Sequence, residues 1–559
     1  MKEAADSSAW QLPSTSLRSH RCAPILWLPF SLCLECALET RVCDLQKGVK
    51  NCGPCSSSTT YPVKDGEHSL DSSSGFERRV LHALLENPFV PMRSLRGVFP
   101  AATEYYKEDT VLEMLIHVAS NVSAIVASPW AEMEAHKSVA AVIVVLNCHE
   151  YEPCQAISAL KLIFQRYFSG CTCRCIVLDP TAEAQAAMSQ HVFLPAHSYS
   201  PAEDVARYLL TEIALSIVQQ VNVHIVSISA SVENMATAKR PTTENAGMIN
   251  GAGEVLTARV VNSRLTKKRG DLLLRVGALD AALLAYHESL PEADALWCSA
   301  TLESLASLRY LQTAPLLDFT TAVEGIFSSL ESDAMAWNED MNTTLNQLEI
   351  IVENVRMDQR KATSLLKHSL PASSLNRRLP KEVEEPLSTH TENFRRQVAI
   401  IRRFFGEDNT EVVGICVEDA SKNARGAFKE ILHVSFVELQ IYLQEALQQL
   451  RSVPGSVLGL QEREATIQLK RTELFAEEGD KKKFLESLTV LKTAAKNAPV
   501  SMQRDLRWRI PYLSSLCGCW RKAIFNVVEA AVSEQQANAH GASVFSCCVR
   551  VEWPAYLFH

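Results

Sequence analysis

The apolar residues between positions 76 and 230 follow strand and helix periods in turn. Three apolar runs, rich in β-branched residues, predict strands at residues 139–146, 173–178 and 221–228. Two segments between them have apolar residues at helical spacing and predict helices at residues 152–168 and 201–220. We therefore expect an α/β N-terminal domain over residues 76–230, with parallel strands joined by right-handed crossovers.

Strand patterns are absent after this region, and nearly every segment has the period of a helix. The clearest examples are residues 341–368, 390–405, 424–452, 461–478 and 481–497. A long series of helices without strands favours stacked helix pairs. We interpret residues 263–535 as an all-α, TPR-like helical solenoid, joined to the α/β domain by a polar linker at 231–262.

The two ends of the chain lack sustained periodicity. Residues 1–75 contain six cysteines and serine-rich stretches, and we expect a disordered Cys/Ser-rich leader there. Its longest apolar run, residues 23–34, contains Pro24 and Pro29 and is too short to cross a membrane. Residues 536–559 are expected to form an irregular tail.

The most specific local motif begins at Gly270. Small or apolar residues follow it at the spacing of a tetratricopeptide (TPR) helix pair: Leu273, Gly277, Ala282 and Tyr286. In this interpretation Gly270 and Ala282 let two helices approach closely, Gly277 forms the turn, and Leu273 and Tyr286 fill the seam. A generic helical hairpin is the alternative. Two weaker copies, at Leu474-Gly479-Phe484 and Tyr512-Gly518-Ala523, indicate a degenerate solenoid.

Composition restricts the classes of partner. The chain has 559 residues, and its 55 Lys and Arg against 64 Asp and Glu give a formal charge of −9. This balance offers no overall basic field for nucleic acid. The basic runs at residues 267–269 and 481–483 are expected to be solvated helix ends, and the second of these runs could face an anionic membrane.

Cysteines provide the only metal-like pattern. Cys33 and Cys36 are separated from Cys52 and Cys55 by 15 residues, a spacing found in four-cysteine zinc sites. The second pair also matches a thioredoxin-type redox motif, but serines and threonines follow it instead of a helix. Because its serine-rich flanks cannot bury a core, we predict a metal-free leader. The 17 cysteines are too dilute in 559 residues for a disulfide scaffold, which indicates a reducing compartment. The alternating cysteines at 171, 173 and 175 are interpreted as small apolar fillers on one face of a strand.

Signatures of common enzymes are missing from the sequence. It contains no G-x-x-x-x-G-K-[ST] phosphate loop, no complete dinucleotide fingerprint, no H-E-x-x-H and no G-x-S-x-G. We therefore predict a protein that is not an enzyme, with no catalytic, cofactor-binding or metal-binding residues.

Residues 264–303 resemble the signature segment of subunit nine of the trafficking protein particle (TRAPP) complex, the large tethering subunit of its second form. The matching positions are Gly270-Asp271-Leu272, Gly277, Tyr286-His287, Asp294, Leu296-Trp297 and Leu302-Glu303. Two more stretches are similar to segments of the same family. The first is residues 130–148, which contain a tryptophan, a histidine before a basic residue and a predicted buried strand. The second is residues 502–531. The family's β-rich C-terminal half has no counterpart, so we expect a shortened chain.

This resemblance implies a non-catalytic scaffold subunit of a multisubunit vesicle-tethering complex in Golgi trafficking, with no cofactor. Its partners would be other TRAPP subunits and, indirectly, a Rab GTPase, with peripheral contact to Golgi or endoplasmic reticulum membranes from the cytoplasm. Within the signature, we expect Asp294 to cap a helix and Trp297 to be buried. The alternative function is a TPR-type adaptor that binds short peptides.

Overall fold

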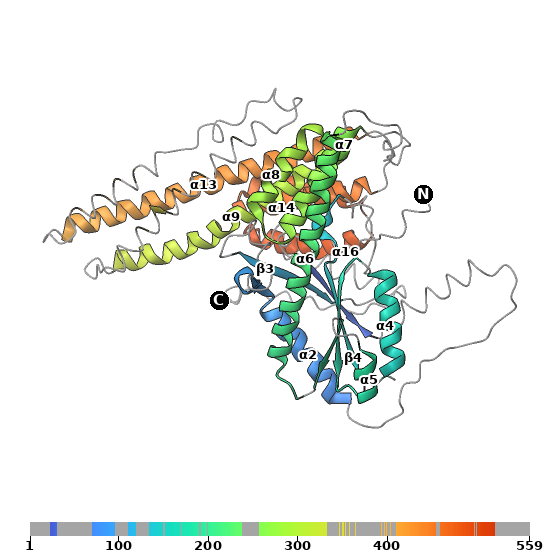
Figure 1. Cartoon of the computed structure of the whole chain (residues 1–559). Coiled ribbons are helices and arrows are strands. Elements are labelled where there is room, and N and C mark those ends of the chain that lie inside the picture. The colour runs from blue at the N-terminus through green and yellow to red at the C-terminus, as the bar shows by residue number, and fades with distance from the viewer. Residues whose placement is uncertain are drawn as a thin grey trace.

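The computed structural model describes nine stretches of the chain and a few single residues between 346 and 403. The stretches are 23–30, 70–95, 110–118, 133–148, 151–188, 192–237, 257–332, 410–453 and 459–519, apart from isolated positions within them. The structure is mostly helical, with an α/β body built on one sheet and a helical body beside it (Figure 1).

The α/β body contains a six-stranded sheet with strand order β2-β3-β1-β4-β5-β6. The strands are β1 (Ala23–Pro29), β2 (Phe89–Pro91), β3 (Val111–Val118), β4 (Ala141–Asn147), β5 (Thr172–Leu178) and β6 (Phe193–Ala196). β2 runs antiparallel to β3, and the other neighbouring strands are parallel. All seven residues of β4 are buried, as expected for a parallel strand covered on both faces.

Helices cover both faces of this sheet. They are α2 (Leu70–Glu86), α3 (Met92–Leu95), α4 (Pro153–Tyr167), α5 (Ala182–Ala187) and α6 (Ala202–Thr237). Because side chains alternate along a strand, Ile25 and Trp27 of β1 join a core with α2 and α6, while Leu26 and Leu28 join one with α4. In Figure 1, α2 and α6 accordingly lie on one side of the sheet and α4 on the other.

The helical body begins with a tight hairpin and continues into much longer helices. Its elements are α7 (Ala258–Arg275), α8 (Leu279–Ser289), the 3₁₀ turn η6 (Leu290–Glu292), α9 (Ala295–Ser332), α13 (Thr410–Ser452), α14 (Leu460–Glu478), α15 (Lys481–Lys496) and α16 (Val500–Leu516). The long helices α9 and α13 pack along each other and project from the body as a two-helix arm (Figure 1).

Several predicted elements are confirmed. β4 and β5 correspond to the strands predicted at 139–146 and 173–178, and α4 to the helix at 152–168. The helices predicted at 424–452, 461–478 and 481–497 correspond to α13, α14 and α15. The coarse division into an α/β part followed by helices is therefore correct.

The strand predicted at residues 221–228 is wrong, because these residues belong to α6. Their β-branched side chains favour a strand locally, but Val221 and Ile225 lie four residues apart and both are buried in the core. Packing of one helical face overrides the local preference. α6 extends to Thr237 and α7 begins at Ala258, so the predicted 231–262 linker is helical at both ends.

The disordered leader predicted for residues 1–75 is wrong at Ala23–Pro29, which form β1 between β3 and β4. A parallel strand buried on both faces reads as a continuous apolar run, and the prolines lie near its two ends. The helix α2 also begins inside the predicted leader, at Leu70. The four cysteines at 33, 36, 52 and 55, Ala523 and the tail 536–559 lie outside the described residues.

By length and composition, α6 is the one described helix that is long and apolar enough to cross a membrane. In the structure it packs against α2, β2 and β5 of the α/β body and against α7 of the helical body. α6 is therefore a helix shared by both bodies.

The α7–α8 hairpin has the close approach that its sequence predicts. Gly277 forms the turn with a positive φ of 78°, which favours glycine. Gly270 lies directly against the ring of Tyr286, and a Cβ at position 270 would be 2.7 Å from two ring carbons. The Tyr286 side chain is fully buried, so the ring has no free space in which to retreat.

We expect Gly270→Leu to lower the free energy of unfolding by about 1–3 kcal/mol, because the added side chain overlaps the Tyr286 ring. Thermal melting of the full chain measures this effect. The matched control is Gly75→Leu in α2, where no described atom lies within 4 Å of an added Cβ. Equal melting of the two variants would show that the seam at Gly270 tolerates a larger residue.

Candidate functional site

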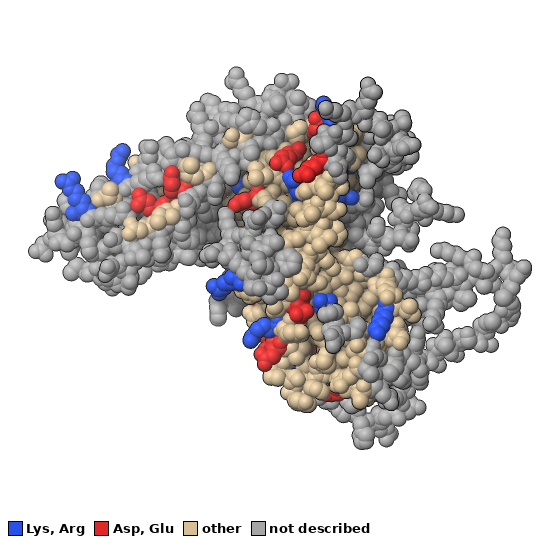
Figure 2. All heavy atoms as spheres, in the orientation of Figure 1, with Lys and Arg blue, Asp and Glu red and all other residues tan. Residues whose placement is uncertain are grey.

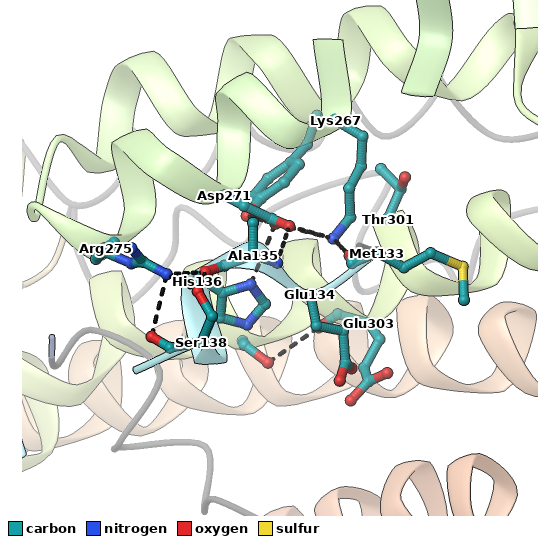
Figure 3. A network of polar contacts seen from close by, with 12 residues as sticks. Met133, Glu134, Ala135, His136, Ser138, Lys267, Asp271, Arg275, Thr301 and Glu303 are labelled. Atoms are coloured by element: carbon teal, nitrogen blue, oxygen red, sulfur yellow. Dashed lines mark hydrogen bonds and ion pairs between the residues drawn. The ribbon is translucent and has the colours of Figure 1, made fainter. Parts of the chain in front are cut away.

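Three signature residues, Asp271, Tyr286 and Glu303, meet at a buried polar contact between the two bodies, which we call the junction (Figure 3). A short segment before β4, residues 133–138 with the 3₁₀ turn η5 (Ala135–Lys137), lies against the helices there. The junction consists of Met133, Glu134, Ala135, His136 and Ser138 from this segment, Lys267, Asp271 and Arg275 from α7, Tyr286 from α8, Glu303 from α9, and Arg463 and Lys470 from α14.

The carboxylate of Asp271 is the centre of the junction and is completely buried. Lys267 donates to both of its oxygens, at 2.9 and 2.7 Å, and the hydroxyl of Tyr286 donates to Oδ1 at 2.7 Å. From the α/β body, the backbone N–H of Ala135 donates to Oδ2 at 3.0 Å, and Nδ1 of His136 lies 3.2 Å from Oδ1. Asp271 thus binds its own helix pair and the α/β body at once.

Three side chains on one face of α7 hold the backbone of segment 133–138. Lys267, Asp271 and Arg275 are spaced four residues apart and point toward the segment in Figure 3. Lys267 donates to the carbonyl of Met133, and Arg275 donates to the carbonyl of Ala135 and, at 3.1 Å, to that of Ser138. These bonds to main-chain atoms fix the path of the segment.

A second set of ion pairs links the same segment to α9 and α14. Arg463 donates to Glu134 at 2.9 Å and to Glu303 at 2.7 Å. Lys470 donates to the other oxygen of Glu303 at 2.5 Å and to the hydroxyl of Ser307 at 3.2 Å. All of these charged side chains are nearly fully buried, so each depends on its partners for compensation.

The electrostatics favour charged partners. Burial alone raises the pKa of Asp271, but the charges and hydrogen bonds of Lys267 and His136 outweigh it and hold this pKa well below the usual 3.8. Burial also lowers the pKa of Lys267. The charged form of Asp271 is stabilised more than that of Lys267, because donors from three elements surround the carboxylate. The pKa of Arg463 is raised, since Glu303 and Glu134 overcome its burial.

Trp297 packs beside the junction, at the start of α9. It is 5% exposed and contacts Met133 and Ala300, which confirms the predicted burial. Asp294 accepts a hydrogen bond from the backbone N–H of Trp297 at 3.3 Å, which confirms the predicted cap. Arg264 pairs with Asp294 at 2.7 Å and lies over the indole ring, 5.1 Å from its centroid.

The predicted signature residues therefore fall into two groups with different roles. Asp271, Tyr286, Asp294, Trp297 and Glu303 make polar or aromatic contacts in and around the junction. Gly270, Leu273, Gly277 and Ala282 shape the α7–α8 hairpin that carries it, with Leu273 and Ala282 buried in the core.

Sequence reasoning missed the partners of these residues. Lys267 was expected at a solvated helix end, which is wrong: it is 1% exposed in the middle of α7. The spacing of Lys267, Asp271 and Arg275 along one helix face was a usable signal, because a carboxylate between two cations indicates a shared partner. No local pattern marks Arg463 or Lys470, which lie far along the chain.

The junction is suited to holding parts together. The carboxylate oxygens of Asp271 and Glu303 accept hydrogen bonds from other groups of the chain, so they do not face an open cavity. At the carboxyl ends of β1 and β4, where open α/β sheets commonly bind ligands, the rings of Phe30 and Tyr151 pack edge to face at 4.5 Å. Within the described ranges, no group of three or more His, Cys, Asp or Glu is placed to hold a metal.

The alternating cysteines, Cys171 just before β5 and Cys173 and Cys175 within it, lie on one side of the sheet, as predicted. Cys175 belongs to the core beneath α4, and Cys171 and Cys173 pack against it. Burial raises the pKa of the Cys171 thiol to about 11, although Arg275 lies near it. These thiols are therefore protonated at neutral pH and act as apolar packing groups.

No protein-family model matches the chain, and no curated protein is significantly similar to it. The interpretation of the junction therefore rests on its own contacts.

We expect Asp271→Asn to lower the free energy of unfolding by about 3–5 kcal/mol at pH 7, because it leaves Lys267 buried without its charge partner. Since the folded pKa of Asp271 is depressed, its stabilisation is complete above the unfolded pKa of about 3.9 and is lost as pH falls through the folded pKa. The difference from wild type should therefore shrink below about pH 4.

Urea unfolding of the full chain at pH 7 and at lower pH measures this difference. Glu486→Gln, at an exposed position of α15, is the control and should change stability by less than about 0.5 kcal/mol at either pH. A wild-type-like Asp271→Asn at pH 7 would contradict a charged carboxylate in the junction.

We expect Trp297→Ala to cost about 3–5 kcal/mol of stability, because a large buried ring is lost. Tyr199→Ala is the aromatic control, since Tyr199 is 82% exposed. Melting of the full chain distinguishes the two variants. A Trp297→Ala protein that melts like wild type but loses a binding partner would make Trp297 an interface residue instead.

Proposed function

We propose that this chain is a non-catalytic scaffold subunit of a multisubunit vesicle-tethering complex, similar to subunit nine of the TRAPP complex. One observation supports this proposal most directly. The two segments that carry most of the resemblance, residues 130–148 and 264–303, contact each other through Asp271, Ala135 and His136. Because the polar groups of the signature bind other parts of the same chain, they fix the arrangement of the α/β body and the α7–α8 hairpin.

The helical body supplies the extended surface that a scaffold requires. The two-helix arm of α9 and α13 projects well beyond the α/β body (Figure 1). We propose that α7–α8 is a TPR-like unit and that the turns at Gly479 and Gly518, both with positive φ, mark degenerate units of a solenoid. In this proposal the long helices are departures from a regular repeat.

The proposed setting follows the resemblance. The chain would act from the cytoplasm at Golgi membranes, in traffic that also involves the endoplasmic reticulum. It would bind other TRAPP subunits and support activation of a Rab GTPase that those subunits perform. This assigns the chain a geometric role, with no cofactor of its own.

The alternative, a TPR-type adaptor for short peptides, is less consistent with the junction. Such an adaptor needs cations on a helix face that are open to a ligand. Two of the cations of α7, Lys267 and Arg275, are already bound to the backbone of segment 133–138. The side of α7 that carries these two residues is therefore covered by a segment of the chain itself.

Affinity purification of the tagged full chain from cells, followed by mass spectrometry, tests the proposal. We expect other TRAPP subunits to co-purify in fixed proportions, in one large complex on size exclusion. Asp271→Asn should reduce their yield, because it loosens the junction that fixes the shape of the scaffold. A wild-type chain that elutes alone would contradict the scaffold function, and exchangeable capture of short peptides would favour the adaptor.

A further inference from the structure

The helices α15 and α16 carry a concentration of positive charge. Residues 481–516 contain eight Lys and Arg against two Asp and Glu, whereas the whole chain has a formal charge of −9. On the face drawn in Figure 2, the described Lys and Arg side chains are scattered among acidic and uncharged ones. The basic run at 481–483 is exposed at the start of α15, and within it Lys483 pairs with Asp480 at 3.0 Å. A local excess of positive charge on an acidic chain indicates an anionic partner.

The helices α15 and α16 form an antiparallel hairpin. At one end, the Gln503 side chain of α16 donates to the carbonyls of Lys496, at 3.3 Å, and Ala498, at 2.8 Å. At the other end, Lys481 lies against Gly518, just after α16, where an added Cβ would be 3.5 Å from the lysine Nζ. The line of α15 that begins at Lys481 and ends at Lys496 therefore runs beside α16.

Basic residues occupy the border between the two helices. On α15, Lys481, Lys492 and Lys496 are separated by eleven and four residues, which places them on one face. On α16, Arg507 comes one turn after the glutamine that contacts α15, so it lies on the side of α16 that borders α15. Lys492 is half-buried and the other three are exposed. We call these four residues, with the exposed Lys482 beside them, the basic face.

The basic face has few acidic neighbours. Glu486 is the one acidic residue of α15 and lies at the edge of the face, one turn after Lys482. Asp505 is the one acidic residue of α16, and its position two residues before Arg507 is on another side of the helix. Among the described residues, no acidic side chain forms an ion pair with the three exposed lysines of the face. These charges are therefore available to an external anion.

The polar character of the face identifies the kind of anion. A protein partner is held mainly by apolar and aromatic side chains at the centre of the contact. The exposed Val490 and Leu516 come nine residues, or two and a half turns, after Lys481 and Arg507, so they lie on the opposite sides of their helices. The exposed Tyr512 is on the same side as Leu516, one turn before it. The basic face therefore lacks the apolar centre of a protein interface.

The headgroups of an anionic membrane match such a face. Each Lys or Arg close to an anionic bilayer strengthens binding by about fivefold, with no need for apolar contact. From Lys481 to Lys496 the face extends over about 22 Å, at 1.5 Å per residue. Charges farther from the bilayer than about 8 Å are largely screened at physiological ionic strength. The acidic remainder of the chain therefore does not prevent a contact made by this face.

We propose that the basic face of α15 and α16 is a contact surface for an anionic phospholipid membrane. Its cations lie at the level of the headgroups, without insertion of apolar side chains. This inference rests on the proposed function, in which the chain acts at a membrane, and it names the surface that touches the bilayer. A contact made by charge alone is reversible and depends on salt and on lipid composition.

Sedimentation of the purified full chain with lipid vesicles tests the basic face. We expect binding to vesicles of phosphatidylcholine with phosphatidylserine, weaker binding at high salt, and none to phosphatidylcholine alone. Lys481→Gln with Lys496→Gln should lower the affinity at least about tenfold, because two cations of the face are lost. Arg78→Gln with Lys422→Gln removes the same charge at exposed positions of α2 and α13 and should leave binding unchanged. Both double variants should melt like wild type, because all four positions are exposed.

Glu486→Gln tests the face in the opposite direction, since misfolding does not strengthen binding. We expect a several-fold gain in affinity for the anionic vesicles, because the negative charge at the edge of the face is removed. Equal binding to both kinds of vesicle, or wild-type binding by the Lys481→Gln and Lys496→Gln variant, would overturn the surface and leave the scaffold function intact. Loss of a protein subunit from that variant, with vesicle binding unchanged, would also overturn it and identify an acidic protein partner.

The surface and the proposed function fail separately. A chain that co-purifies with no TRAPP subunit, yet binds anionic vesicles through Lys481 and Lys496, would contradict the scaffold function and support the surface.

Discussion

The structure depends most on one buried carboxylate. Placing an ionised aspartate in the interior costs several kcal/mol unless donors compensate it. Asp271 obtains these donors from α7, from α8 and from the segment before β4, so its charge is satisfied only when all three are in place. The position of the α/β body relative to the α7–α8 hairpin is therefore a condition for burying this charge.

The second ion-pair set extends this condition to distant parts of the chain. Glu134 follows Met133 directly, but its side chain turns to Arg463 of α14. One short segment is thus held by its backbone on one side and by its glutamate on the other. Removal of one partner from such a buried ion pair leaves an uncompensated charge and is strongly destabilising. The helical body is consequently placed by its contact with the sheet as well as by its own helix packing.

The sequence predicted those features whose cause is local. The apolar run of β4, the capping Asp294 and the close pair Gly270 and Tyr286 each carry their reason within a few residues. The errors arise where distant partners decide. The local sequence of residues 221–228 favours a strand, but packing of one face of α6 against the core makes them helical. Lys267 is expected to be solvated from its sequence neighbours, but segment 133–138 covers it in the structure. The candidate site was found as a motif, but its ionic partners are set by the tertiary fold.

The position of β1 has a consequence for the order in which the sheet is made. Among the strands that the structure describes, β1 is synthesised first, yet its partners Met114–Val118 and Ala141–Val145 are synthesised much later. During synthesis this apolar strand must wait with both edges unpaired, which exposes it to chaperones and to aggregation. A chain that starts after residue 30 would keep β3 and β4 but lose the strand between them. The sheet would then be divided into two parts at its centre.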